Sequence, residues 1–171
     1  MKKITLVLTL ILSGIVSNAQ SVKDLTMKIN EIEDRIAIKN VVDTFSILAD
    51  VKDTKTQALL FTQNATVESR VNGQAGMKLS GRKQIGDTFG AYLSNFEAVY
   101  HINGQQSITL NGDKATAISY CMVTLIGTEN NKRMKISMGV YYNDEFVKEK
   151  GLWLISKRTS NFVWQDRQEI K

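Results

Sequence analysis

The pattern of apolar and polar positions divides the chain into a helix-rich first half and a strand-rich second half. From about Val22 to Asp50, apolar residues recur at steps of three and four, which predicts an amphipathic helix. Its apolar positions are Ile29, Ile32, Ile36, Val41 or Val42, Phe45 and Leu48. A second helix is predicted over Lys55 to Phe61, and a third opens at Gly81 and keeps helical spacing to Phe96.

The segments between and after these helices have the pattern of strands. Ala65 to Val71 is predicted as a strand that ends in an Asn72-Gly73 turn. Four longer strands are predicted over Val99–Leu110, Lys114–Ile126, Arg133–Lys148 and Leu152–Gln165. Their connectors are short enough for antiparallel hairpins, and strands of this length require a curved sheet with bulges. We therefore expect the first helix to cover one face of the sheet above a concave pocket.

The N-terminus has the features of a secretory signal peptide. Lys2 and Lys3 precede an apolar run from Ile4 to Val16, and small residues lead to Ala19. Cleavage after Ala19 predicts a signal peptide over residues 1–19, a single domain over residues 20–171 and a secreted or periplasmic protein. The alternative is a retained N-terminal anchor, but the run is shorter than the ~20 residues of a membrane span, so no membrane association is expected after cleavage.

Composition excludes several kinds of partner. Loss of the two signal lysines lowers the net charge from +5 to +3, which is too mild and dispersed to indicate nucleic-acid binding. Cys121 is the only cysteine, so no disulfide is expected, and its apolar strand context predicts a buried, inert thiol. The chain has no metal-ligand spacing, and we expect no metal and no organic cofactor.

His101 is the only histidine, and it stands where the strand-rich half begins. Because the unperturbed pKa of imidazole lies near neutral pH, His101 is the first candidate for a general acid or base.

Several short motifs in a fixed order carry a resemblance to a known family. They are Glu33-Asp34-Arg35-Ile36-Ala37-Ile38, Leu48-Ala49-Asp50-Val51-Lys52-Asp53, Leu60-Phe61-Thr62-Gln63-Asn64-Ala65-Thr66-Val67, Gly81-Arg82-Lys83-Gln84-Ile85, Val99-Tyr100-His101, Asn111-Gly112-Asp113-Lys114-Ala115 and Gly151-Leu152-Trp153-Leu154-Ile155. Over about Ile29 to Asp166, the chain resembles the SnoaL-like domains of the nuclear-transport-factor-2-like superfamily. The resemblance implies an α+β fold in which a cone-shaped, antiparallel or mixed sheet wraps around a long N-terminal helix, in the order α-α-β-α-β-β-β-β.

The same resemblance, which extends to scytalone dehydratase and the polyketide cyclases, implies a catalytic pair formed by Asp50 and His101. Asp50 orients the imidazole and His101 moves a proton, so a lyase or isomerase of this kind needs no cofactor. Two features depart from the dehydratase-like pattern: Ala49 stands where a tyrosine is common, and the next strand lacks a second histidine. The residues expected to line the pocket are Tyr100, Tyr120, Met122 and Tyr142.

Other interpretations stay open. Asp50 can simply end its helix and His101 can be a half-buried residue with no chemical role. The chain is then a non-catalytic domain that binds a small hydrophobic molecule, or that pairs with a second copy through the outer face of its sheet. A third possibility is a subunit that only stabilises another protein, because the superfamily supplies such subunits.

Overall fold

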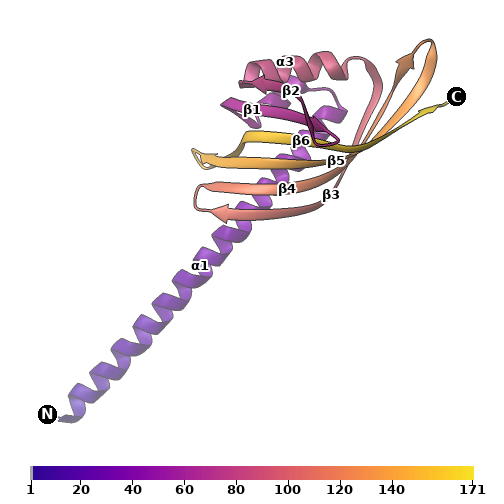
Figure 1. Cartoon of the computed structure of the whole chain (residues 1–171). Coiled ribbons are helices and arrows are strands. Elements are labelled where there is room, and N and C mark those ends of the chain that lie inside the picture. The colour runs from indigo at the N-terminus through magenta and orange to yellow at the C-terminus, as the bar shows by residue number, and fades with distance from the viewer. Residues whose placement is uncertain (1) are drawn as a thin grey trace. The chain divides into compact units, whose positions relative to one another are not determined.

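The computed structural model describes the backbone of residues 2–171 and the side chains of residues 21–171. It contains, in order, α1 (Lys2–Asp50), α2 (Thr54–Ala58), β1 (Phe61–Val71), β2 (Gln74–Ser80), α3 (Arg82–Leu93), β3 (Phe96–Asn111), β4 (Lys114–Glu129), β5 (Lys132–Glu149) and β6 (Leu152–Glu169) (Figure 1). The side chains of the predicted signal peptide lie outside the described residues, so that segment and the domain start at residue 20 stay predictions.

The chain divides into two compact units. The first ends at Ile36 and, as far as it is described, is a stretch of α1. The second, Ala37–Lys171, holds the end of α1 and all other elements. No helix of the described chain combines the length and apolarity needed to cross a membrane.

The six strands form one mixed sheet in the order β2-β1-β6-β5-β4-β3, which is not closed. β1 runs parallel to β6, and every other neighbouring pair is antiparallel. This arrangement confirms the predicted α+β class. The order of elements differs in one respect, because the sequence analysis did not include β2.

β2 completes a hairpin with β1 through the predicted Asn72-Gly73 turn. Asn72 and Gly73 both have positive φ, 50° and 79°, as a tight two-residue hairpin turn requires. Ala75, Met77 and Leu79 alternate with Gly76 and polar residues, so β2 carries a period-two pattern that the sequence analysis missed, although Leu79 is its only buried residue.

The long strands bend as their length requires. β3 and β4 have 16 residues each, β5 and β6 have 18 each, and the pairings are interrupted between Asn103 and Gln106 of β3 and at two points between β5 and β6. Such bulges increase the local twist of a sheet, so the strands curve around the core.

The end of α1 packs on this curved sheet. Ile38, Val42 and Phe45 belong to one buried apolar cluster, and Ala49 belongs to a second cluster formed mainly by β3, β4 and β5. Of the apolar stripe predicted from the sequence, Val42 and Phe45 are buried and Leu48 is half-buried, while Ile38 and Ala49 are buried residues that the prediction did not include. The earlier members of the predicted stripe remain exposed: they are Ile29, Ile32 and Ile36.

Candidate functional site

The site begins at the C-terminus of α1, where the chain makes a sharp turn just after Asp50. Lys52 has a φ of 58°, in the left-handed region, and its N–H donates to the Ala49 carbonyl at 3.0 Å. The N–H of Asp53 reaches back to the Leu48 carbonyl at 2.9 Å. These two bonds form a Schellman motif, which satisfies carbonyls that a helix end leaves without partners. Asp53 caps the next helix by accepting from the Thr56 N–H at 3.1 Å, so the Asp50 carboxylate is free for another contact.

The partner of Asp50 is His101, on β3. The Nδ1 atom of His101 lies 2.6 Å from Oδ1 of Asp50, and the backbone N–H of His101 donates to Oδ2 of the same carboxylate at 3.3 Å. The His101 side chain is 7% exposed and that of Asp50 is 23% exposed. A carboxylate can only accept hydrogen bonds. The contact with Asp50 therefore selects the tautomer of His101 that carries its proton on Nδ1, which leaves the lone pair of Nε2 available.

Burial controls the charge of this imidazole. Desolvation lowers the pKa of His101 below its ordinary value of 6.5, and the positive charge of Arg158 lowers it further. The hydrogen bond and the negative charge of Asp50 oppose this shift without reversing it. His101 is therefore neutral near pH 7, as a general base must be before it accepts a proton.

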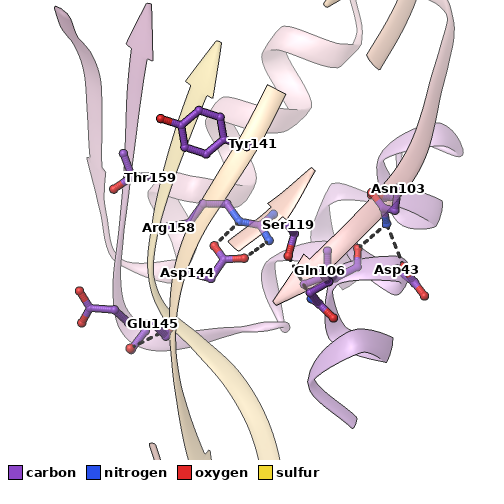
Figure 2. Close-up of polar contacts among 12 residues, drawn as sticks. Asp43, Asn103, Gln106, Ser119, Tyr141, Asp144, Glu145, Arg158 and Thr159 are labelled. Atoms are coloured by element: carbon purple, nitrogen blue, oxygen red, sulfur yellow. Dashed lines mark hydrogen bonds and ion pairs between the residues drawn. The ribbon is translucent and has the colours of Figure 1, made fainter. Parts of the chain in front are cut away.

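A second polar contact joins the same two elements on the preceding turn of α1. The Ser46 hydroxyl donates to Oδ1 of Asn103 at 3.0 Å. Nδ2 of Asn103 donates to Oδ1 of Asp43 at 3.0 Å (Figure 2), and it also donates to the Val42 carbonyl at 3.3 Å. Since His101 and Asn103 lie two residues apart on β3, both face α1. These bonds hold the strand that carries His101 against the helix that carries Asp50.

A buried ion pair joins two other strands of the sheet, β5 and β6. Asp144 of β5 and Arg158 of β6 are cross-strand partners whose side chains have no exposed surface. Nε and Nη2 of Arg158 each donate to one oxygen of Asp144 at 2.7 Å, which is the bidentate geometry of a strong pair (Figure 2). The remaining nitrogen of Arg158, Nη1, is buried without a hydrogen-bond partner in the described structure.

The Arg158 guanidinium contacts two aromatic rings. Its Cζ atom lies 4.2 Å from the ring centre of Phe45 and 4.2 Å from that of Tyr142, and the two rings meet edge to face at 68°. A cation over an aromatic ring is stabilised by the quadrupole of the ring, and the effect grows as water is removed. Phe45 and Tyr142 also line the cavity described next, so the ion pair supports part of its wall.

The cavity has a volume of about 330 Å³ and a lining that is mainly apolar. Its wall includes His101 and aromatic rings from several elements, namely Phe45, Phe89, Tyr92, Tyr142 and Phe162. A volume of this order fits a small organic molecule, and an apolar wall with a few polar groups is typical of such sites.

Of the four residues expected to line this cavity, one belongs to its wall and three do not. Tyr142 is buried and belongs to the wall. Tyr100, Tyr120 and Met122 do not, and their exposed fractions of 60%, 53% and 40% place them on the outer face of the sheet. The cause is strand alternation: His101 and Cys121 point inward, so their neighbours in sequence point outward.

Two further titratable side chains near the cavity stay protonated at neutral pH. Cys121 is buried, and desolvation raises its pKa to about 11, so the thiol stays protonated at neutral pH. Burial also raises the pKa of Tyr142 far above its ordinary value, which keeps it a neutral hydrogen-bonding phenol. Within the described residues, no three His, Cys, Asp or Glu side chains gather closely enough to hold a metal ion.

Asp144, Arg158, Asn103 and Ser46 are the polar residues of this region that the sequence analysis missed. One signal was present, because Asp144 continues the alternating series Ile136, Met138, Val140 and Tyr142. The next inward position of that series is a carboxylate, and a buried carboxylate requires a cationic partner.

The mixed, curved sheet and the end of α1 packed on it define an α+β protein, and comparisons with known proteins identify its family. A family model for the SnoaL-like domain matches residues 30–159. The chain belongs to the SnoaL-like domain family.

The relatives found by sequence and by structure are distant in sequence but similar over most of their length. An uncharacterised protein of Mycobacterium tuberculosis is 24% identical over 140 residues, which is 81% of this chain and 92% of that protein. A putative scytalone dehydratase from Novosphingobium aromaticivorans has a TM-score of 0.69 at 20% identity, over 83% of this chain and 91% of its own. The hexachlorocyclohexane dehydrochlorinase LinA-type3 from Novosphingobium barchaimii has a TM-score of 0.70 at 17% identity, over 82% and 94%.

Proposed function

We propose that this protein is an exported, cofactor-independent lyase or isomerase that acts on a small carbonyl or hydroxylated compound in the apolar cavity. The observation that carries the proposal is the 2.6 Å contact between Nδ1 of His101 and Asp50 at the wall of that cavity. Relatives of the same fold include a putative scytalone dehydratase and a dehydrochlorinase, and their names describe eliminations.

The reaction we propose starts with proton abstraction by Nε2 of His101. The electrons of the broken C–H bond form a new C=C bond, and the leaving group departs with its bonding pair. For a hydroxyl leaving group, the proton held by His101 returns to the departing oxygen, so water and an alkene are the products. If nothing leaves, the electrons move onto a neighbouring carbonyl, and return of the proton to a different carbon is an isomerisation.

Two side chains assist His101 in this scheme. Asp50 stabilises the imidazolium that forms, because the carboxylate lies against the Nδ1 proton. Tyr142 lines the same cavity and stays protonated, so its hydroxyl is suited to hydrogen-bond an oxygen of the substrate. In this role Tyr142 replaces the tyrosine that dehydratase-like relatives carry next to the aspartate.

The experiment starts from the ligand. Small molecules that co-purify with the protein are identified by mass spectrometry, and the compound found is then incubated with the wild-type protein, His101→Gln and Asp50→Asn. We expect His101→Gln to abolish turnover and Asp50→Asn to lower it by about two orders of magnitude, in line with the usual contribution of acid–base groups.

A matched control separates loss of chemistry from loss of fold. Tyr100→Phe changes the neighbouring residue on the outer face of β3, and it should leave turnover unchanged. All variants are compared by circular dichroism and thermal unfolding. A folded His101→Gln protein that converts the compound at the wild-type rate refutes the assignment. A ligand that binds and is never converted favours the non-catalytic alternative.

The second candidate function is a non-catalytic domain that pairs with a second copy through the outer face of the sheet. It is favoured by a group of exposed apolar residues there, Tyr100, Ile102, Tyr120, Met122, Val163 and Trp164. Apolar surface of this kind on a soluble protein often marks an interaction site. We test it with Met122→Lys, which should lower the molar mass measured by light scattering if this face is the interface, and leave it unchanged if it is not.

A further inference from the structure

The first turns of α1 whose side chains are described carry an apolar stripe, which we call the N-terminal stripe. It consists of Val22, Leu25, Ile29, Ile32 and Ile36. Its side chains are 64%, 59%, 46%, 56% and 55% exposed, respectively. The steps between its members are three, four, three and four residues, which is the a and d spacing of a coiled coil. An exposed stripe of this spacing on a helix indicates a helical partner.

The N-terminal stripe is separate from the stripe by which α1 contacts its own core. The core-facing residues of α1 are Ile38, Val42, Phe45 and Ala49. No residue of the N-terminal stripe belongs to either of the two buried apolar clusters.

Charge complementarity identifies the partner as a second copy in parallel orientation. With Val22, Ile29 and Ile36 at position a, Lys28 takes position g and Glu33 takes position e. In a parallel pair, g of one helix meets the following e of the other, so Lys28 lies beside the partner's Glu33, and by symmetry the contact occurs twice. An antiparallel pair instead places Lys28 beside the partner's Arg35, where two positive charges repel.

The first heptad of the seam agrees with this choice. Positions a hold only β-branched residues, and Leu25 at the first d position completes the combination that favours two-stranded parallel coiled coils, whereas Ile32 at the second d position by itself favours a larger number of strands. Within each helix, Arg35 pairs with Glu31 at 2.8 Å, but an exposed pair of this kind is weak and does not cancel the repulsion between Arg35 and Lys28 in an antiparallel arrangement. We propose that the N-terminal stripe joins two copies of the chain as a parallel two-stranded coiled coil.

To test this interface, we express the full chain and measure the molar mass of the purified protein. Sedimentation equilibrium should show a dimer whose dissociation constant rises at least a hundredfold in Ile29→Lys/Ile32→Lys, because two lysines then stand at the seam. The matched control, Lys23→Gln/Met27→Lys, changes residues at positions b and f and should leave the constant unchanged. Loss of a dimer through Met122→Lys but not through Ile29→Lys/Ile32→Lys overturns the proposal, as does a monomeric wild-type protein.

Cross-linking tests the orientation separately. In Leu25→Cys, a parallel pair in register brings the two new thiols together, so mild oxidation should convert most of the protein to a covalent dimer. Met27→Cys, on the far side of the helix, should stay monomeric on a denaturing gel. Cys121 does not compete, because it is buried and its pKa is raised to about 11. Equal cross-linking of the two variants, or none in either, overturns the parallel pair. Neither test uses the acid–base site.

Discussion

Asp144 and Arg158 face each other directly across β5 and β6 and form a bidentate ion pair with no exposed side-chain surface. The pair lies beneath Tyr142 and Phe45, whose rings line the cavity. Removing one member leaves the other charge buried and uncompensated, which typically costs 3–5 kcal/mol, whereas replacing both with apolar side chains is often neutral.

We therefore predict that Arg158→Met and Asp144→Leu each lower the free energy of unfolding by about 3–5 kcal/mol, and that the double variant is more stable than either single variant. The measurement is urea unfolding followed by circular dichroism. Lys157→Met serves as the control. It removes the Lys157–Glu145 ion pair next to the buried one, and this pair is exposed, so it contributes only about 0–1 kcal/mol. Single variants as stable as the wild-type protein contradict this account of the cavity wall.

The second prediction concerns the protonation of His101. Because it is the only histidine, its ring signals in an NMR titration are unambiguous. We expect a pKa below 6.5, and a still lower pKa in Asp50→Asn, because the hydrogen bond and charge that favour the imidazolium are then lost. A pKa above 6.5 in the wild-type protein would mean that the hydrogen bond and charge of Asp50 outweigh desolvation, contrary to this account.

The same shift predicts a pH dependence of stability. The folded state holds His101 with a lowered pKa, so between that pKa and 6.5 the unfolded state binds more protons. This contribution to stability is fully present above pH 6.5 and is lost as the pH falls through the folded-state pKa. Thermal unfolding midpoints should show that His101→Gln removes this part of the pH dependence. An identical pH profile in the variant contradicts the prediction.

The fourth prediction concerns Trp164, whose indole occupies the space beside Gly139 on the neighbouring strand. A Cβ atom at Gly139 would stand 2.2 Å from Nε1 of Trp164, so Gly139→Ala must displace the indole. We expect a shift in tryptophan fluorescence and an altered near-ultraviolet circular dichroism spectrum. Gly104→Ala is the matched control, because its Cβ would meet nothing closer than 3.7 Å. An unchanged spectrum in Gly139→Ala contradicts this packing.

Much of the fold follows from local signals in the sequence. The turns at Asn72-Gly73, Asn111-Gly112-Asp113 and Glu149-Lys150-Gly151 contain residues with positive φ, and Val42 and Phe45 of the predicted apolar stripe lie on the buried side of α1. The end of α1 was also predicted correctly at Asp50. These features depend on near neighbours in the chain, which is why pattern and turn chemistry predict them.

The composition of the cavity wall depends on contacts between distant residues, and the sequence predicts it less well. On β4 both faces carry apolar side chains, so alternation alone does not show that Cys121 points inward and Tyr120 outward. The Asp144–Arg158 pair and the bond from Ser46 to Asn103 require the register of strands and helix to be known. Which of the predicted apolar positions of α1 are buried is also not evident from the sequence: Ile29, Ile32 and Ile36 are exposed, whereas Val42 and Phe45 are buried.

The central claim is that Asp50 holds a neutral His101 with its Nε2 lone pair available to a ligand. The most direct test is the ¹⁵N NMR spectrum of the single imidazole at pH 7.5, which reports the proton on each ring nitrogen. We predict a neutral ring that is protonated at Nδ1 and unprotonated at Nε2, with loss of this preference in Asp50→Asn. A ring protonated at Nε2 in the wild-type protein, or a cation at this pH, would contradict the claim.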